Sequence, residues 1–191
     1  MNWFPPYRYI LASGSPRRQQ ILADLGLPFV VKTYDVPEIF PDGLPMTEVP
    51  VFLAREKARP FEGELLPGDL LITADTIVWL EGEVLGKPAD QAAARQMLQK
   101  LSGKQHQVVT GVCLKSCEKE TTFFAVTNVD FKPLTDAEID YYIEQYNPVD
   151  KAGAYGIQEW IGYIGITHVE GSYFNVVGLP VQKLYAEILN F

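Results

Sequence analysis

The chain has 191 residues, of which 47% are hydrophobic and 12% aromatic, so it can bury a substantial core. This length predicts one domain over residues 1–191, or one domain whose two lobes flank a cleft, and it excludes a second large domain. Sixteen Lys and Arg residues against 24 Asp and Glu residues give a net charge of −8. Because binding to a nucleic-acid backbone requires a basic face, we expect no nucleic-acid partner, whereas a local basic pocket for a small anion is compatible with this charge.

No membrane span or targeting peptide is expected. The longest apolar run, Leu70–Leu80, is shorter than the roughly 18 residues that a span needs and is interrupted by Asp75. Residues 1–8 lack a basic stretch followed by an apolar segment and a cleavage site. Cys113 and Cys117 have neither the spacing of a redox pair nor that of a zinc site, and we expect reduced thiols. These features predict a cytoplasmic protein with no membrane partner.

The first half of the chain predicts strands and helices in alternation. An apolar helical face follows Pro16, and a nearly continuous apolar run begins at Leu70, which is typical of a buried strand. The expected elements, in order, are a strand at Tyr9–Ala12; a helix that Ser15 caps and Gly26 closes; a strand at about Phe29–Asp35; a loop at Val36–Met46; a helix that Thr47 caps and that reaches roughly Arg59; a loop at Gly63–Asp69; and the strand Leu70–Leu80.

The second half continues this alternation. Thr135 and Glu138 match the capping box of one helix, and Pro180 is suited to start another. The expected elements are a turn at Glu81–Glu83 leading to Val84 and Leu85; a helix at about Asp90–Leu101; strands at Gln107–Leu114 and Thr121–Phe131 joined as a hairpin; a helix from Thr135 to Tyr146; a loop at Val149–Gln158; paired strands at Ile161–Val169 and Ser172–Val177; and a final helix from Pro180. The pattern predicts an α/β fold with a mixed sheet and flanking helices.

The first candidate site is the sequence Ser-Gly-Ser-Pro-Arg-Arg that joins the first strand to the first helix. Arg17 and Arg18 occupy the positive end of the helix dipole, which costs on the order of a few tenths of a kcal/mol each unless an anion is bound there. The hydroxyls of Ser13 and Ser15, the exposed backbone N–H groups and the two guanidinium groups could cradle a phosphate. A solvated basic helix start explains the same spacing, and the sequence is not a P-loop.

The second candidate is Asp75, which places a carboxylate inside the buried strand. Such a charge is costly unless it is paired, hydrogen-bonded or bound to a metal. The carboxylate could ligate Mg²⁺ or take a proton from an attacking water, or it could end the strand and accept backbone hydrogen bonds at a turn. Thr76 beside it supplies a hydroxyl group.

Three lysines are candidate counter-charges. Lys57 lies four residues after Leu53 and eight after Val49, so it extends the buried stripe of its helix and should point toward the protein, where its ammonium requires an anion. Lys87 lies in a stiff Gly-Lys-Pro break, and Lys151 precedes a glycine-bearing loop. A single lysine is more commonly a surface residue. Together with the arginines, however, the three could neutralise a polyphosphate.

Gln158 is the fourth candidate. It follows two glycine bends, and its primary amide presents a donor beside an acceptor, as the N3–H and carbonyl edge of uracil or thymine requires. Loop glutamines are nevertheless commonly just solvated. His106 and His168 lack the spacing of a metal pair, and we expect both to be structural.

Several short blocks in this sequence resemble the Maf family, in the order that the family shows and over nearly the whole chain. The resemblance implies an elongated α/β fold with a central cleft, related to the inosine-triphosphate pyrophosphatases. It also implies hydrolysis of a nucleoside triphosphate to its monophosphate and pyrophosphate. The blocks are Leu11–Arg18, Leu53–Ala58, Ala74–Thr76, Gly86–Pro88, Leu101–Gly103, Asp150–Gln158 and Val177–Pro180.

The resemblance also points to a branch of the family. Arg17, Thr76 and Gln158 match the positions associated with the branch that acts on dTTP and UTP. Glu159 and Trp160, in contrast, stand where a glycine usually follows the glutamine. The implied substrate is therefore a small pyrimidine nucleotide, and modified pyrimidine nucleotides remain open.

Catalytic roles follow from the same resemblance. Asp75 matches the proposed proton acceptor, and Glu38, Lys57 and Lys87 resemble further active-site groups. Glu38 and Asp75 would hold Mg²⁺ or Mn²⁺, while Ser13, Ser15, Arg17, Arg18, Thr76, Lys151 and Gln158 would contact the substrate.

Two further expectations come from the family. A homodimer is our prediction from the resemblance alone. The family name also carries a link to septum formation, so a non-catalytic nucleotide-binding regulator is the alternative function. Release of pyrophosphate would distinguish an enzyme from such a regulator.

Overall fold

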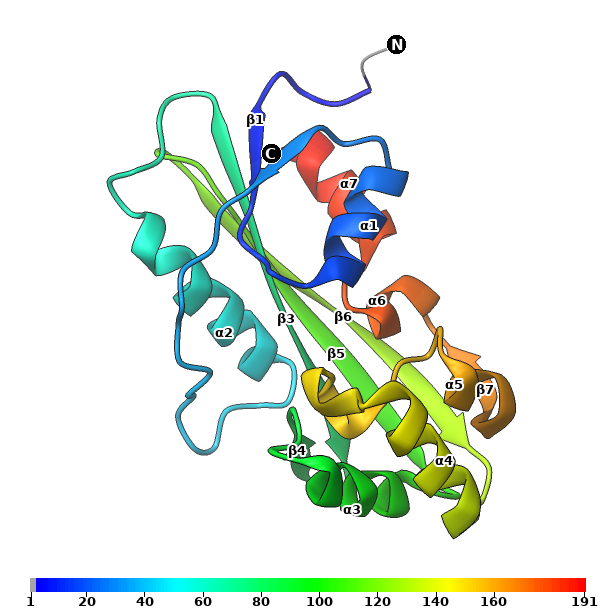
Figure 1. Cartoon of the computed structure of the whole chain (residues 1–191). Helices are drawn as coiled ribbons and strands as arrows, with labels where there is room; N and C mark the ends of the chain where they lie inside the picture. The colour runs from blue at the N-terminus through cyan, green and yellow to red at the C-terminus, as the bar shows by residue number, and fades with distance from the viewer. Residues whose placement is uncertain (1–2) are drawn as a thin grey trace. The chain divides into compact units, whose positions relative to one another are not determined.

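The computed structural model describes residues 3–191. The prediction that residues 1–8 contain no signal peptide falls partly on residues 1 and 2, which lie outside the described residues. Its strands are β1 (Arg8–Leu11), β2 (Phe29–Val31), β3 (Asp69–Leu80), β4 (Glu83–Leu85), β5 (Gln105–Lys115), β6 (Glu120–Phe131) and β7 (Ile166–Glu170). Within the described range these seven strands form one sheet in the order β2-β1-β3-β5-β6-β7, with β4 paired to β3 (Figure 1). β1 runs parallel to β2 and β3, whereas the β3–β4 and β6–β7 pairs are antiparallel.

Helices flank this sheet. They are α1 (Pro16–Asp24), α2 (Glu48–Ala58), α3 (Gln91–Leu101), α4 (Asp136–Tyr146), α5 (Trp160–Gly165), α6 (Tyr173–Val177) and α7 (Val181–Asn190), with short 3₁₀ helices at Arg59–Phe61, Pro148–Asp150 and Ala152–Ala154. The mixed sheet with flanking helices confirms the predicted α/β class. Among the described residues, no helix combines the length and the apolar character needed to cross a bilayer.

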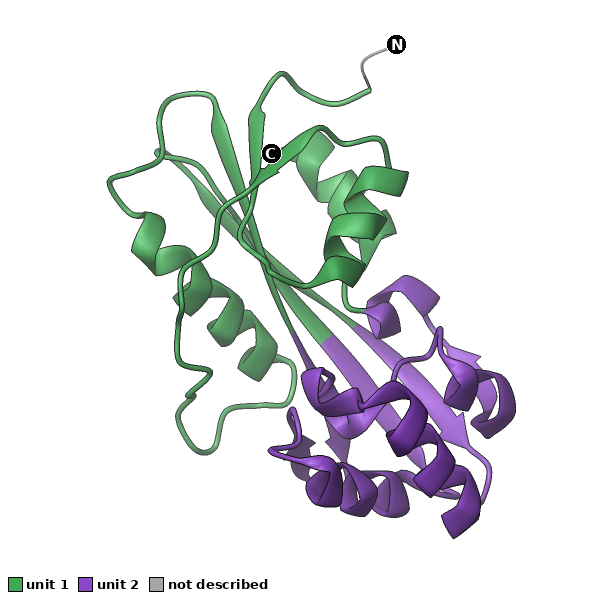
Figure 2. Ribbon diagram, viewed as in Figure 1, with its two compact units in different colours: residues 1–75, 110–125, 178–191 green, residues 76–109, 126–177 purple. Residues whose placement is uncertain are grey.

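The chain divides into two compact units (Figure 2). Unit 1 comprises the residues up to Asp75 together with Thr110–Ala125 and Gly178–Phe191, and unit 2 comprises Thr76–Val109 and Val126–Val177. Strands β3, β5 and β6 each contribute residues to both units.

In unit 1, the strands lie between α2 on one side and α1 with α7 on the other (Figure 1). The α2 side has its own buried cluster, formed by Ile10, Ala12, Ala54, Ala58, Phe61, Leu71 and Cys113. Strand β5 comes so close to α2 that a Cβ on Gly111 would lie 2.3 Å from the backbone nitrogen of Val51. Burial raises the pKa of Cys113 to about 12, and both cysteines are free thiols, as predicted.

Unit 2 has a core in which α3 and α4 pack on the strands. Its buried members are Val78, Leu80, Leu85, Ala94, Leu98, Leu101, Val108, Val129, Phe131, Ile139, Tyr142, Ile143, Ala154, Tyr155, Ile157 and Ile161. His106 lies within this region, 1% exposed, with Nε2 2.7 Å from the hydroxyl of Tyr155 and its ring 5.3 Å from that of Phe131. The expectation that His106 is structural agrees with this environment.

The helix boundaries are partly those that the sequence predicts. The capping box of Thr135 and Glu138 is confirmed, and Gly26 ends α1 with φ +77°, a conformation that glycine adopts without strain. Ser15 and Thr47 occupy the expected N-cap positions, but neither hydroxyl accepts a hydrogen bond from its helix. The capping role of these two side chains was therefore wrong, although the helix starts were right.

The predicted strand Phe29–Asp35 ends earlier, at Val31. Lys32 and Tyr34 bind the carboxylate of Glu64 through their side chains. Beyond Val31, these side chains therefore contact Glu64 while the chain enters the loop that carries Glu38.

The paired strands predicted at Ile161–Val169 and Ser172–Val177 were wrong. Only Ile166–Glu170 is a strand; the flanking segments are the helices α5 and α6. A Cβ on Gly162 would lie 1.9 Å from the carbonyl oxygen of Ile157, so the α5 backbone packs directly on the preceding turn. Ser172 directly precedes α6, and its carbonyl oxygen accepts from the Asn175 N–H at 3.1 Å. Tertiary packing thus overrides the strand propensity of the isoleucines and valines.

Burial of His106 predicts a pH-dependent stability. Burial lowers the pKa of His106 to about 4, below its unfolded value of 6.5. The unfolded chain therefore takes up the proton first as the pH falls, and stability present above pH 6.5 is lost between about pH 6.5 and 4. Between pH 7.5 and 5, this linkage should lower the free energy of unfolding by about 2 kcal/mol. Urea denaturation of wild type and His106→Gln should show that increment only in wild type.

The exposed His168 supplies the matched control for this measurement. His168→Gln should retain the wild-type pH dependence. An identical pH dependence in wild type and His106→Gln would contradict the assignment to His106.

Candidate active site

The centre of the candidate site in unit 1 is an ammonium held between two carboxylates. Lys57 Nζ donates to Asp75 Oδ1 at 2.5 Å and to Glu38 Oε1 at 2.8 Å. The side chains of Lys57 and Asp75 are 18% and 8% exposed, so this ion pair is largely shielded from water. The predicted inward direction of Lys57 is confirmed, and its anions are Asp75 and Glu38.

Local structure explains why these groups meet. Asp75 belongs to β3, which is buried along most of its length, so its carboxylate has little contact with bulk water. Lys57 follows the buried residues Val49 and Leu53 on the same stripe of α2, which packs its helix face toward the strands. Glu38 reaches the same ammonium from the loop that follows β2, with 38% of its side chain exposed.

A second cation, Arg18, ties the start of α1 to the backbone around Asp75. Its Nε donates to the carbonyl oxygen of Gly178 at 2.8 Å, and its Nη1 donates to that of Ala74 at 2.9 Å. Nη1 also donates to Ser13 Oγ at 3.3 Å, and the same oxygen accepts from the Ser15 N–H. Arg18 thus fixes the Ser-Gly-Ser turn against the strand that carries Asp75.

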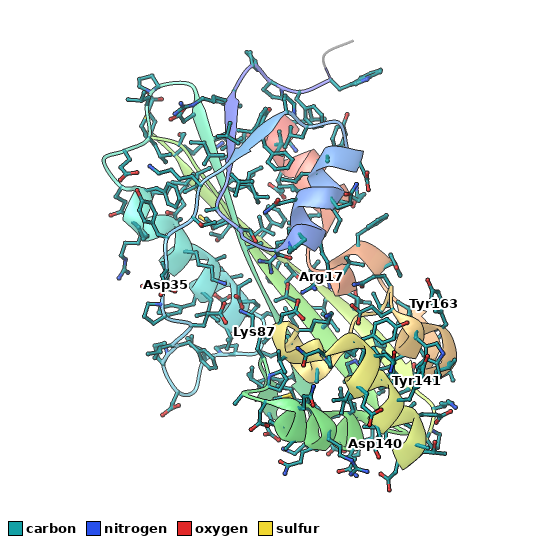
Figure 3. The ribbon with its side chains drawn as sticks, in the orientation of Figure 1. Arg17, Asp35, Lys87, Asp140, Tyr141 and Tyr163 are labelled. Carbon is teal, nitrogen blue, oxygen red and sulfur yellow. The ribbon has the colours of Figure 1, made fainter. Side chains whose placement is uncertain are left out.

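These groups share one electrostatic environment. Burial lowers the pKa of the Arg18 guanidinium; the Asp75 and Glu38 carboxylates oppose this shift, and the Arg17 charge adds to it. Figure 3 places Arg17 at the N-terminal end of α1. Unit 1 therefore gathers three cations and two carboxylates around a helix start, an arrangement suited to a highly charged anion.

In unit 2, Lys151 is a buried ammonium with two carboxylate partners. Its side chain is 8% exposed and lies 2.7 Å from Asp150 Oδ1 and 3.2 Å from Glu159 Oε1. Lys151 is thus already paired with carboxylates from its own unit. Its charge also holds the side chain of Glu159 in place.

Gln158 lies on a tight turn in the same unit. The Glu159 N–H donates to the Gly156 carbonyl oxygen at 3.0 Å, so Ile157 and Gln158 occupy the two central positions of the turn. Oε1 of Gln158 is buried, and no donor among the described residues reaches it. A buried acceptor without a donor is costly, which favours a donor supplied by a ligand.

Two further predicted residues, Thr76 and Lys87, also lie in unit 2. Lys87 is exposed, and the carbonyl oxygen of the preceding Gly86 accepts from the Gly153 N–H at 3.1 Å, so its segment lies beside the loop that carries Lys151. Thr76 directly follows Asp75 in β3 and, because side chains alternate along a strand, points to the opposite face.

The predicted site residues therefore fall into two groups. Unit 1 brings together Ser13, Ser15, Arg17, Arg18, Glu38, Lys57 and Asp75, and unit 2 holds Thr76, Lys87, Lys151 and Gln158. Sequence reasoning missed Tyr142, whose hydroxyl donates to Glu159 and accepts from the Gly156 N–H. A tyrosine on the apolar stripe of a helix gives no signal of such a contact.

The expected divalent metal fits the donor set of unit 1. The described residues contain no group of three or more His, Cys, Asp or Glu side chains that could hold a metal ion. Asp75 and Glu38 nevertheless direct carboxylate oxygens at one point, now taken by the Lys57 ammonium. Mg²⁺ bound with a nucleotide commonly uses only one or two protein carboxylates, because phosphate oxygens and waters complete its shell.

Comparison with known proteins shows the family of this chain. The family model described as Maf-like protein matches residues 8–191. The chain belongs to the Maf family. The dTTP/UTP pyrophosphatase of Phocaeicola vulgatus is 56% identical to this Maf protein over 183 residues, which cover 95% of each chain. The dTTP/UTP pyrophosphatase of Flavobacterium psychrophilum is 51% identical over 187 residues, covering 98% of this chain and 96% of the other.

A solved structure is also similar to this Maf protein. The nucleoside-triphosphatase / dITP/XTP pyrophosphatase of Mycobacterium abscessus aligns with a TM-score of 0.48 and 15% sequence identity, covering 96% of this chain and 95% of that one.

The buried ion pair of this Maf protein predicts an energetic coupling. Lys57→Met leaves the Asp75 carboxylate without its ammonium and should lower the free energy of unfolding by about 2 kcal/mol at pH 7. Adding Asp75→Asn to that variant should recover at least half of the loss, because no buried charge is then left unpaired. Urea denaturation of the two single variants and the double variant measures the coupling.

Lys100 is the matched control for Lys57. It pairs with Glu83 at 2.8 Å, but the two side chains are 49% and 58% exposed. Lys100→Met should therefore cost no more than about 0.5 kcal/mol. Equal losses for the Lys57 and Lys100 variants would show that the Asp75 pair has no special energetic weight.

Proposed function

We propose that this Maf protein is a nucleoside triphosphate pyrophosphatase that hydrolyses dTTP and UTP to the monophosphate and pyrophosphate. The observation that carries the proposal is the Asp75–Lys57–Glu38 cluster, in which Asp75 is buried, beside the arginine-bearing start of α1. The names of relatives more than 50% identical over nearly the whole chain support the same activity. They do not favour the alternative, a non-catalytic nucleotide-binding regulator of septum formation.

In the proposed reaction, Asp75 acts on the attacking water. The Lys57 ammonium binds Asp75 Oδ1 and fixes the orientation of the carboxylate, which accepts a proton from the water. The water oxygen forms a bond to the α-phosphorus, the bond from that phosphorus to the bridging oxygen breaks, and pyrophosphate leaves. Lys57, Arg17 and Arg18 stabilise the negative charge that develops on the phosphate oxygens.

Asp75 and Glu38 are the residues that would hold Mg²⁺ or Mn²⁺. When bound, such a cation neutralises part of the triphosphate charge and polarises its phosphoryl groups. The Lys57 ammonium binds one oxygen of each carboxylate, Asp75 Oδ1 and Glu38 Oε1, so it holds the two side chains near each other.

Base selection is assigned to Gln158. Its buried Oε1 can accept the N3–H of thymine or uracil, and the adjacent amide nitrogen can donate to a ring carbonyl. Cytosine has an unprotonated N3, so it would leave the Gln158 oxygen without its donor. Modified pyrimidines that keep the N3–H remain compatible with this recognition.

Replacing Asp75 tests the reaction itself. Asp75→Asn keeps the size of the side chain but removes the proton acceptor, so it should lower kcat for dTTP about 10²- to 10⁴-fold. Circular dichroism should show an intact fold. The measurement is pyrophosphate release in the presence of Mg²⁺ or Mn²⁺.

Asp42 in the exposed loop provides the control, and Asp42→Asn should leave kcat unchanged. Pyrophosphate release at the wild-type rate by Asp75→Asn would remove Asp75 from the mechanism. Nucleotide binding without any pyrophosphate release by wild type would instead support the regulator.

Replacing Gln158 tests base selection. Gln158→Glu exchanges the amide donor for a repelling carboxylate oxygen, so kcat/KM for dTTP and UTP should fall at least about tenfold relative to dCTP. Gln145, which is exposed on α4, gives the control variant Gln145→Glu. An equal loss of kcat/KM for dTTP, UTP and dCTP would exclude base recognition through the Gln158 amide.

A further inference from the structure

The turn that carries Gln158 is fastened by one side chain from a different element. Tyr142 on α4 is fully buried, and its hydroxyl accepts from the Gly156 N–H at 3.0 Å while it donates to Glu159 Oε2. Gly156 and Glu159 are the first and last residues of the turn, which their own backbone hydrogen bond closes at 3.0 Å. A single hydroxyl therefore joins the two ends of the segment whose centre holds Gln158.

The side chain of Glu159 is committed to this contact rather than to a helix cap. Glu159 is the N-cap residue of α5, yet its carboxylate accepts no hydrogen bond from that helix. Its two oxygens instead contact Tyr142 and Lys151, whose ammonium lies 3.2 Å from Oε1. The Glu159 side chain is 19% exposed, so the Lys151 charge compensates a largely shielded carboxylate.

The same carboxylate lies close to the Gln158 amide. A Cβ on Gly156 would be 2.8 Å from Glu159 Cδ and 3.0 Å from Gln158 Nε2, so both side chains close over this glycine. On the other side, α5 packs directly on the turn, because a Cβ on Gly162 would lie 1.9 Å from the Ile157 carbonyl oxygen. The Gln158 side chain therefore starts from a backbone that is fixed at both ends.

The direction of the hydrogen bonds is also fixed. Burial and the Glu159 carboxylate raise the pKa of Tyr142, so its hydroxyl stays protonated at neutral pH. A protonated hydroxyl donates to the carboxylate and accepts from the Gly156 N–H, and both contacts are satisfied together.

We propose that Tyr142 and Glu159 are positioning residues for base selection, which hold the Gly156–Glu159 turn so that the Gln158 amide keeps a single orientation. The base-selective part of this inference rests on the proposed function. Glu159 thereby has a role of its own at the position where the Maf resemblance leads one to expect glycine.

The orientation of the Gln158 amide can be tested without any activity. In wild type labelled with ¹⁵N, the Gln158 side-chain amide should give one dispersed pair of resonances, assigned by its loss in Gln158→Ala. Tyr142→Phe and Glu159→Ala should move this pair toward the position of a solvated amide or broaden it. Glu159→Gln keeps an oxygen that can accept from Tyr142 and should retain most of the wild-type shift.

Kinetics then tests the consequence for base selection. Tyr142→Phe and Glu159→Ala should raise KM for dTTP and UTP about tenfold, with kcat changed less than threefold and with kcat/KM for dCTP unchanged. Glu159→Gln should restore at least half of the loss on a logarithmic scale. A merely structural role would lower thermal stability and reduce activity toward all bases equally.

Matched controls exist on the same helix. Tyr141 on α4 is 47% exposed and packs its ring on Trp160, so Tyr141→Phe removes only an exposed hydroxyl (Figure 3). Glu144→Gln neutralises an exposed carboxylate on α4. Both variants should match wild type in the spectrum and in KM.

The outcomes separate the two proposals. Unchanged Gln158 amide resonances in Tyr142→Phe and Glu159→Ala would overturn the positioning role, and so would equal losses for dTTP and dCTP. A wild-type protein that fails to hydrolyse dTTP or UTP would refute the proposed function instead, while the amide resonances would still decide whether Tyr142 and Glu159 orient Gln158.

Discussion

The buried carboxylate of Asp75 is the constraint on which the chemistry of unit 1 depends. An ionised group inside an apolar strand would be unfavourable by several kcal/mol without a counter-charge. Lys57 supplies that charge at 2.5 Å, and it can do so because the apolar stripe of α2 packs toward the strands. The packing of α2 on the strands therefore both stabilises the fold and positions the Lys57 ammonium beside Asp75.

In each unit, a side chain also holds the backbone next to a candidate site residue. Arg18 donates to the carbonyl oxygens of Ala74 and Gly178, so a residue in the helix start also fixes the chain next to Asp75. In unit 2, the hydroxyl of Tyr142 holds the backbone of Gly156 and the side chain of Glu159. In both places, side chains that the core buries set the position of groups that can meet a ligand.

Much of the site could be predicted from local pattern. The four- and eight-residue spacing of Lys57 from Leu53 and Val49 correctly indicated an inward ammonium, and an Asp inside an apolar run correctly indicated a buried charge. Patterns failed where packing outweighed propensity. The isoleucines that follow Trp160 favour a strand, but this segment forms the helix α5, in which Gly162 packs against the Ile157 carbonyl oxygen.

By itself, the sequence determined the α/β class, the position of most elements and the identity of the charged groups, because periodicity, caps and the Maf blocks are local properties of the chain. Only the tertiary structure decided which side chains contact one another at the candidate site. Lys57 binds both Glu38 and Asp75, and Tyr142 closes the turn of Gln158. These contacts join residues that are 14 to 19 positions apart in the sequence. No local pattern encodes such contacts, because they arise from how helices and loops pack around the strands.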